Sequence, residues 1–487
     1  MKQKSLLSKF KLHRIDEEFI YFLTFVYALS TCEISAVELF KVTKSSTYGR
    51  HTRAVRDVYN LGVGWKYGLS MACEMISERI SKKKEDPLQQ FLIKFSQVVR
   101  LGDELRSFLK QELEATIRNF TSIQEQSIES QKLFLEMFYT IMSTASIMVA
   151  ANSLLIMLVG GINGEQIMTT TIIAVLSAIG GFVFMLHFMF PRNSIMKKNF
   201  EKIKTMNVQI FISIVISIVL GAVLHYTHAI PLMLILAVVG VPLTITGFLL
   251  QRIETVVSNC SRTYPSMIMH FGQIYSALGT IGYTLDAVLK SDFGPLQKHI
   301  VILDNRIKNK INTEIAFDLF SKDTGSAVIA SGNTIISNSL IHGADMKEVG
   351  YVVSEVTSKM NEGRAKRTQL AKTFEMIVIV MHVLTLAVFG LMNKIALIFT
   401  SLIQGQTLSQ KILPIHPLDP HYLNLILPII VLSLSLISGF AIKVSQGGTY
   451  RTVLFNIGIL LILGALTVYG TTMALSHFLD HGILNLA

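Results

Sequence analysis

The sequence predicts an all-α, polytopic membrane protein with two duplicated cytoplasmic helical-bundle domains. Hydrophobic residues make up 51% of the 487 residues, charged residues only 16%, and the mean hydropathy is +0.49. These values exclude an ordinary soluble protein. The charged residues are concentrated in two long stretches, and each stretch contains one copy of a short pattern. Segregated charge and an internal repeat together predict two soluble lobes that alternate with two groups of membrane helices.

Seven apolar stretches are long enough to cross about 30 Å of hydrocarbon as α-helices. They form a group of four and a group of three, at residues 137–159, 167–190, 208–228, 230–250, 374–392, 423–442 and 453–476. A further apolar run at 395–403 follows the fifth stretch, so eight or nine crossings stay open. The apolar run at 19–30 is too short to span a membrane.

The spans divide the chain into five parts. These are a cytoplasmic helical domain at 1–136, a membrane group of about four helices at 137–250, a second cytoplasmic helical domain at 251–372, a membrane group of about three helices at 373–477 and an outer tail at 478–487. Lysine and arginine are frequent in both soluble parts and absent from the connection 160–166. Because basic segments stay on the inner side, we expect a plasma-membrane protein with both domains in the cytoplasm and the C-terminus outside.

The connection at 191–207 is basic as well. Its lysines, which we expect to face membrane lipids, are Lys197, Lys198, Lys202 and Lys204. Arg364, Lys366 and Arg367 precede the fifth span and are expected to anchor it at lipid headgroups. The net charge of +11 therefore reflects membrane orientation. It does not indicate nucleic-acid binding, because the basic residues alternate with acids and lack aromatic platforms.

The internal repeat precedes the last helix of each soluble part. The segment FSQVVRLGDEL at 95–105 aligns with ISNSLIHGADM at 336–346. In both copies a glycine occupies an expected helix C-cap, and an aspartate follows that can start the next helix. These residues are Gly102 and Asp103 in the first copy, and Gly343 and Asp345 in the second.

Other helix signals frame the repeat. Asp86 followed by Pro87 predicts a helix start. Gly294 followed by Pro295 predicts another helix. Its apolar stripe is expected to contain Ile300, Leu303, Ile307, Ile311 and Ile315.

Each final helix of a soluble part reaches the membrane at a Glu-Met pair, which contains Glu136 in the first copy and Glu375 in the second. A carboxylate resists entry into hydrocarbon, since a charge at the centre of a membrane helix costs roughly 2.5–3.5 kcal/mol. The two glutamates therefore fix the depth of their helices. They either mark only the membrane boundary or act as coupling junctions between the soluble and membrane parts.

No motif for catalysis or nucleotide binding is present. The sequence contains no Gly-Lys dipeptide, and so no Walker A loop, and no G-x-S-x-G, H-E-x-x-H or C-x-x-C motif. We therefore expect no enzymatic activity, no cofactor and no metal. Six histidines fall near the predicted outer face, among them His477 and His481, but a metal site would need three or four converging ligands.

One charged pattern suggests partner binding. Arg50, Arg53 and Arg56 recur at three-residue spacing and share one face if the stretch is helical. Such a face can simply be solvated. The alternative is docking to an acidic partner, because arginine is favoured in paired, directional contacts at interfaces.

The arrangement of two soluble lobes with glycine caps, each followed by a membrane group, resembles the type II secretion system F domain superfamily. The length and the number of spans look more like its archaeal branch, the platform proteins of archaella and adhesive pili. The resemblance implies a cytoplasmic hexameric secretion ATPase that docks on the inner domains, where Gly102, Asp103, Gly343 and Asp345 would take part. It also implies pilin-like or archaellin subunits as partners, and leaves a homodimer open.

Two other classes stay open from the sequence. A polytopic transporter or permease would be favoured by a charged pair in the middle of the membrane, and the spans show none. A membrane enzyme that acts on lipids would need acidic or histidine clusters at the inner interface, where only the scattered Glu136 and Glu375 occur.

Overall fold

The computed structural model describes residues 16–32, 34–80, 86–159, 164–190, 195–197, 200, 202–228, 230–404 and 420–484. Within them the regular elements are helices, and the one β contact is an isolated antiparallel bridge between Met196 and Ser326. In chain order these are α2 (Glu17–Ser30), α3 (Ala36–Thr43), α4 (Gly49–Tyr59), η1 (Asn60–Gly64), α5 (Leu69–Ile80), α6 (Pro87–Leu101), α7 (Leu105–Val159), α8 (Gly164–Met189), α9 (Lys202–Tyr226), α10 (Leu232–Leu278), α11 (Ile281–Val288), η2 (Gly294–Leu296), α12 (Gln297–Lys308), α13 (Thr313–Thr324), α14 (Ala327–His342), α15 (Met346–Gln404), α16 (Pro420–Gln446), η4 (Tyr450–Thr452) and α17 (Val453–Leu484).

Seven helices in the described part of the chain are long and apolar enough to cross a membrane, namely α7, α8, α9, α10, α15, α16 and α17. They coincide with the seven predicted stretches and indicate a multi-pass membrane protein. The apolar run at 395–403 continues α15 and does not form a helix of its own. The third and fourth predicted spans, at 208–228 and 230–250, are separate helices, α9 and α10.

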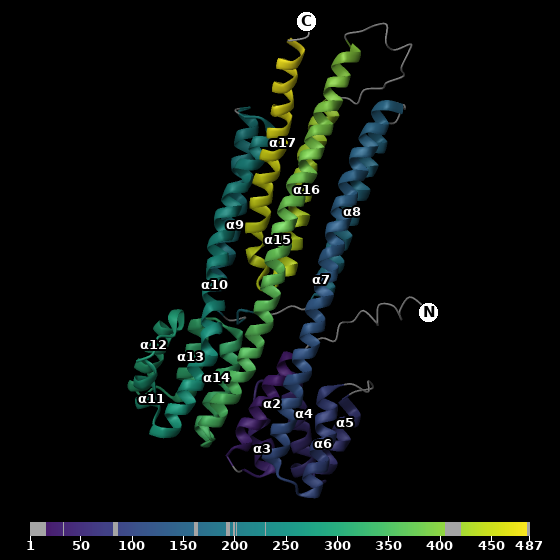
Figure 1. Ribbon diagram of the computed structural model, residues 1–487. Helices are drawn as coiled ribbons and strands as arrows, with labels where there is room; N and C mark the ends of the chain where they lie inside the picture. The colour runs from purple at the N-terminus through teal and green to yellow at the C-terminus, as the bar shows by residue number, and fades with distance from the viewer. Residues whose placement is uncertain are drawn as a thin grey trace.

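Three helices extend well beyond the thickness of a bilayer. α7 has 55 residues, α10 has 47 and α15 has 59. At 1.5 Å per residue they are roughly 80, 70 and 90 Å long, compared with about 30 Å of hydrocarbon. Each one runs without a break from the bundle of long helices into one of the two lobes of shorter helices (Figure 1).

The first lobe contains α2–α6 and the start of α7, and the second contains the end of α10, α11–α14 and the start of α15. Buried side chains of both lobes belong to one continuous apolar core. α2 joins them, because all residues from Phe19 to Ser30 are buried and the helix packs against α7, α14 and α15. The short apolar run at 19–30 is therefore the central helix of the soluble part. The helix order α2–α7 parallels α10–α15, as a duplication predicts, and the duplication itself stays a prediction.

The predicted caps at Asp86, Gly102, Gly343 and Asp345 are confirmed, and a cap at Asp103 stays a prediction. Asp86 accepts a hydrogen bond from the Leu88 amide at 3.0 Å and caps α6. Gly102 and Gly343 end α6 and α14 with φ of 76° and 72°, in the left-handed region that glycine adopts readily. Asp345 accepts from the backbone amides of Lys347 and Glu348 at 3.1 and 3.3 Å, and so caps α15.

The predicted single helix after Gly294 was wrong. α12 ends at Lys308, and Lys310 has a φ of 58° that no helix tolerates. A new helix, α13, then begins after the Asn312 cap. As a result Ile311 and Ile315 are 38% and 55% exposed, although they continue the apolar spacing of the buried Ile300.

Within the membrane group α10 and α17 pack backbone against backbone. A Cβ atom at Gly247 of α10 would lie 2.1 Å from the amide nitrogen of Phe455, and one at Gly240 would lie 2.9 Å from the carbonyl oxygen of Gly458. Small residues permit such close approach between membrane helices, where van der Waals packing replaces the hydrophobic effect. The long helix α10 is therefore tightly joined to α17.

Candidate functional site

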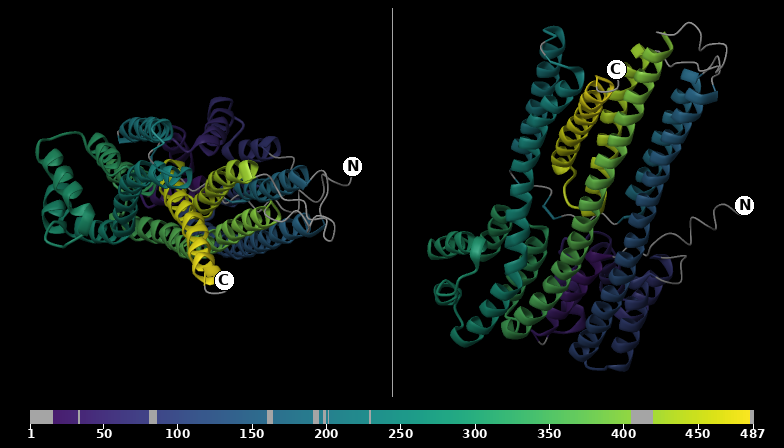
Figure 2. Two further views of the ribbon diagram at one scale, coloured as in Figure 1. Left: turned by 90° about the horizontal axis from the view of Figure 1, so that it is seen from above. Right: turned by 45° about the horizontal axis from the view of Figure 1, so that its top comes forward.

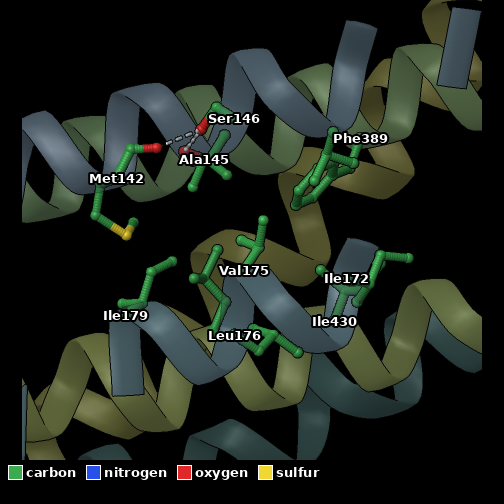
Figure 3. Close-up of a pocket in the computed structure, with 12 residues that line it drawn as sticks. Met142, Ala145, Ser146, Ile172, Val175, Leu176, Ile179, Phe389 and Ile430 are labelled. Carbon is green, nitrogen blue, oxygen red and sulfur yellow. Dashed lines mark hydrogen bonds between the residues drawn. The ribbon is translucent and has the colours of Figure 1, made fainter. Parts of the chain in front are cut away.

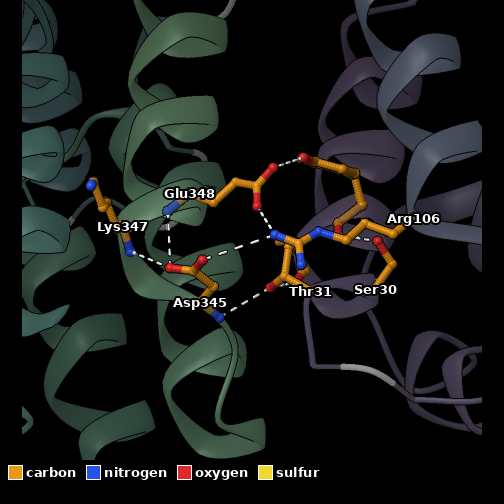
Figure 4. Close-up of polar contacts among 8 residues, drawn as sticks. Ser30, Thr31, Arg106, Asp345, Lys347 and Glu348 are labelled. Atoms are coloured by element: carbon orange, nitrogen blue, oxygen red, sulfur yellow. Dashed lines mark hydrogen bonds and ion pairs between the residues drawn. The ribbon is translucent and has the colours of Figure 1, made fainter.

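A polar cluster connects the two lobes close to the start of α7 and α15 (Figure 4). The Glu348 carboxylate of α15 accepts hydrogen bonds from the Tyr27 hydroxyl of α2 and from the Arg106 guanidinium of α7. Next to it, the Asp345 amide donates to the Thr31 hydroxyl at 3.1 Å. Burial and the Glu348 carboxylate both raise the pKa of Tyr27, so its hydroxyl remains a donor at neutral pH.

Two more ion pairs join the lobes further along α15. Arg364 lies 3.8 Å from Glu17, and Lys366 lies 3.0 Å from Glu125. The Lys366–Glu125 pair is exposed, and exposed pairs contribute only about 0–1 kcal/mol each. The lobes also share one apolar core. Arg364 and Lys366, expected at lipid headgroups, make these contacts with the first lobe instead.

The four residues of the repeat have different surroundings. Gly102 and Asp103 are exposed on the first lobe, and open space surrounds the Cα atom of Gly102. Gly343 is also exposed. Asp345 lies 3.9 Å from Arg106 and belongs to the interlobe cluster. The second copy therefore contributes to an internal contact that the sequence did not reveal.

The predicted arginine face is helical and exposed. Arg50, Arg53 and Arg56 all lie on α4 and face outward. Arg50 is already engaged, with its guanidinium 2.5 Å from Asp16 and 2.9 Å from Asp86. Arg56 donates one hydrogen bond to the Lys44 carbonyl oxygen at 3.3 Å. Arg53 and Arg56 both keep exposed side chains that can reach a partner.

Immediately after α4 the chain exposes apolar side chains on an unusual turn. η1 is a π-helical turn, and Lys66 follows with a positive φ of 61°, a combination often found at functional positions. Trp65, the only tryptophan of the chain, is 73% exposed, and Tyr67 and Met71 are 48% and 54% exposed. We call Trp65, Tyr67 and Met71 the Trp65 patch. Helical periodicity does not predict it, although a single tryptophan between glycines is a visible signal.

Asp16 links α2 to α4 at the edge of this lobe. It accepts from the Phe19 amide at 3.1 Å, and the buried His51 ring nitrogen lies 3.4 Å from its carboxylate. Burial alone raises the pKa of Asp16, but hydrogen bonds and charges of His51 and Arg50 outweigh it and lower the pKa to about 2. Asp16, Glu18 and His51 have ligand atoms within 4.8 Å of one another, yet Arg50 already occupies the carboxylate where a cation would bind.

Replacing Asp16 by Asn is expected to lower the free energy of unfolding at pH 7 by about 1–2 kcal/mol, because a carboxyl with a depressed pKa stabilises the folded state in its charged form. Asparagine still caps α2, so the loss reports the charge. The contribution is complete above the ordinary pKa of 3.8 and disappears as the pH falls through about 2. Thermal unfolding at several pH values measures it. Asp57→Asn, at an exposed position of α4, is the control, and equal melting of Asp16→Asn and wild type at pH 7 would contradict the expectation.

The two expected junctions are continuous helix, and they differ in their surroundings. Glu136 is exposed and has Lys132 at 4.0 Å on its own helix. Glu375 is half-buried and accepts from the side chain of Gln446, at the end of α16, at 3.0 Å. Between them α7 and α15 touch through the fully buried rings of Phe138 and Phe374, whose centroids are 5.4 Å apart.

Arg367 is buried at the end of α16, where the sequence does not predict it. The sequence predicts it at lipid headgroups, but it is 5% exposed and its guanidinium donates to the carbonyl oxygens of Val444 and Ser445 at 3.0 Å each. These carbonyls belong to the last turn of α16, whose final acceptors have no partner within the helix. The buried guanidinium therefore caps α16.

The segment before α9 contacts the second lobe. The Lys197 amide donates to the carbonyl of Gly325 at 2.8 Å, and its ammonium lies 3.1 Å from Asp318. Lys197 therefore contacts the second lobe, whereas the sequence predicts contact with lipid. Lys202 and Lys204 are exposed at the start of α9, so their contact with lipid stays a prediction, and Lys198 lies outside the described residues.

An apolar pocket opens between α7, α8, α15 and α16 in the membrane group (Figure 3). Its empty volume is about 310 Å³, which includes space open to the outside. The only oxygen atoms on its lining side chains are the hydroxyls of Ser146 and Thr385, which bond to each other at 2.7 Å. This lining favours apolar contacts and offers no charged ligand for an ion.

The fold and the site of the described residues together define a multi-pass, all-α membrane protein whose helical lobes continue into its membrane helices. The chain is similar to the protein named flagella accessory protein J of Methanococcus voltae, at 22% identity over 96% of this chain and 86% of that protein. It is likewise similar to flagella accessory protein J of Methanocaldococcus jannaschii, at 23% identity with the same coverage. No protein-family model matches the chain, and no solved structure matches it significantly.

Proposed function

We propose that the protein is the integral-membrane platform of an archaellum or type IV pilus-like assembly machine. A cytoplasmic hexameric secretion ATPase docks on the two lobes, and the platform couples its motion to the extraction of pilin-like or archaellin subunits and to filament assembly. The observation that carries the proposal is the similarity, over 96% of the chain, to two proteins named flagella accessory protein J. The lack of a phosphate-binding motif agrees with a motor supplied by another protein.

The long helices support a mechanical role. α7, α10 and α15 each extend from a lobe into the membrane group as one unbroken helix (Figure 2). A helix transmits axial force through its own hydrogen-bonded backbone. With both lobes in the cytoplasm, as the distribution of lysine and arginine predicts, the motor has direct access to the inner ends of these helices.

On the first lobe we assign the motor contact to the Trp65 patch together with Arg53 and Arg56. Tryptophan, tyrosine and arginine dominate the energetics of protein interfaces, and methionine is enriched there. Here an exposed aromatic turn follows directly on the helix that presents the two arginines. The expected partner surface is an apolar pocket surrounded by acidic side chains.

Trp65→Ala is expected to weaken ATPase binding by about 10- to 100-fold, the range found when an interface tryptophan is truncated. Arg53→Glu with Arg56→Glu is expected to weaken it further at low salt, since the acidic partner is then repelled. Binding of labelled ATPase to the detergent-purified protein measures both effects.

Matched controls come from exposed residues elsewhere. Tyr283 of α11 is 71% exposed on the second lobe, so Tyr283→Ala removes a comparable aromatic surface. Arg118→Glu changes an exposed arginine on α7. Both are expected to bind the ATPase like wild type. Wild-type protein that binds no ATPase would reject the proposed function, whereas tight binding by Trp65→Ala would reject only this docking surface.

A further inference from the structure

The turn between α16 and α17 lies at the end of the membrane group that faces the lobes (Figures 1 and 2). It begins with two consecutive glycines, Gly447 and Gly448, whose φ values are 70° and 71°. η4 then leads into α17. The turn is short. One charged side chain from another helix binds its backbone, and a second binds the end of α16 directly before it.

The first of these side chains is Glu254 of α10. Its carboxylate accepts hydrogen bonds from the Thr449 amide at 2.9 Å and from the Thr452 hydroxyl at 3.2 Å, and it pairs with the Lys443 ammonium at 3.4 Å. The side chains of Glu254 and Lys443 are only 11% and 4% exposed. Removing one member of such a pair leaves a buried charge, so the pair persists only where hydrogen bonds complete it, as they do here.

The second side chain is Arg367 of α15, which binds the end of α16 directly before the turn. Its two hydrogen bonds to Val444 and Ser445 hold the last carbonyls of α16. Positive charge is also favourable at a helix C-terminus because of the helix dipole. α10 and α15 therefore each hold one end of the connection between α16 and α17.

The glycine pair makes this arrangement sterically feasible. A Cβ atom at Gly448 would lie 1.9 Å from a carboxylate oxygen of Glu254, and one at Gly447 would lie 2.8 Å from the guanidinium carbon of Arg367. Either substitution would push a charged side chain off the turn. The left-handed conformation alone does not explain this requirement, since other left-handed glycines, such as Gly279, have open space around them.

We propose that the turn 447–452 is the joint through which movement of the lobes reaches α16 and α17, with Glu254 and Arg367 as its positioning residues. The inference rests on the proposed function, because it takes the motor as the source of that movement. α10 and α15 enter the second lobe, so a shift of that lobe displaces both side chains. Since Glu254 binds the turn and Arg367 binds the last carbonyls of α16 directly before it, α16 and α17 follow as one unit.

The test compares Gly448→Ala with Gly279→Ala. Both substitutions put alanine at a left-handed glycine, but only the first displaces Glu254. In the purified full-length protein, amide hydrogen exchange of the peptide 446–452 is expected to be at least tenfold faster in Gly448→Ala and unchanged in Gly279→Ala. In cells, Gly448→Ala is expected to abolish filaments while the platform still binds and stimulates the ATPase, which a purely structural defect would not do.

A second variant distinguishes loss of the joint from misfolding. Glu254→Leu combined with Lys443→Met removes both buried charges together, a change that folded proteins often tolerate. It is expected to give the same fast exchange and the same loss of filaments at normal protein levels. Unchanged exchange, or normal filaments despite fast exchange, would overturn the joint. Failure of the wild-type platform to bind the ATPase would instead overturn the proposed function.

Discussion

Inserting three glycines directly before Glu136 is expected to abolish filament assembly while membrane insertion and ATPase binding are retained. α7 is one helix from Leu105 to Val159, so force applied to the first lobe reaches the membrane through its backbone. Each glycine costs a helix interior about 1 kcal/mol relative to alanine. Three residues also rotate the following part by about 60°, since a full turn takes 3.6 residues. Phe138 then turns away from Phe374.

The same insertion before Glu375 is expected to have the same effect, because α15 is equally continuous there. Filaments counted by electron microscopy give the readout, and ATPase co-purification shows that docking survives. The control replaces Lys132 and Leu133 by alanine, which alters this exposed surface and keeps the helix and Glu136. If both insertion variants assemble normal filaments, the junctions are passive, and coupling would then be sought in the basic connection 191–207, where Lys197 contacts the second lobe.

The second large effect is expected at Gly247. A valine there would drive its Cβ atom into the Phe455 backbone, 2.1 Å away, so α10 and α17 must separate. Overpacking of a core usually costs about 1–3 kcal/mol, and a clash with backbone exceeds that range because no side chain can yield. We expect Gly247→Val to fail to accumulate as a folded, monodisperse protein.

Fluorescence-detected size exclusion of membrane extracts measures this loss. Gly181→Val is the matched control, because Gly181 also lies in a membrane helix, α8, and no atom lies within 4 Å of its added Cβ. The valine side chain is the same in both variants, so helix propensity contributes equally. A normal elution peak and melting temperature for Gly247→Val would show that α10 and α17 do not pack as described.

Local features were predicted well from the sequence. Apolar length located the seven long helices, and cap chemistry located the ends at Asp86, Gly102 and Gly343, because both depend on residues that are neighbours in the chain. Periodicity alone failed at Ile311 and Ile315, where the left-handed Lys310 ends the helix although the apolar spacing continues.

Contacts between distant segments could not be predicted. Glu254 and Thr449 are 195 residues apart, and no single sequence reveals that they meet. The same limit explains Arg367. In the sequence it is a basic residue directly before a membrane span, as a headgroup anchor would be, and in the fold it caps a helix. It also explains Arg50, since its acidic partners Asp16 and Asp86 lie on either side of it in the chain and reach it only through the fold.

The burial of α2 between the lobes has a consequence for biosynthesis. Tyr27 and Glu348 are 321 residues apart, which a ribosome covers in roughly 15–60 s at typical rates of 5–20 residues per second. During that interval four membrane helices are inserted while the face of α2 that packs on α14 and α15 has no cover. The first lobe is therefore completed late, by a segment made after the membrane is engaged. Chains that stop before α14 leave that apolar face open to aggregation.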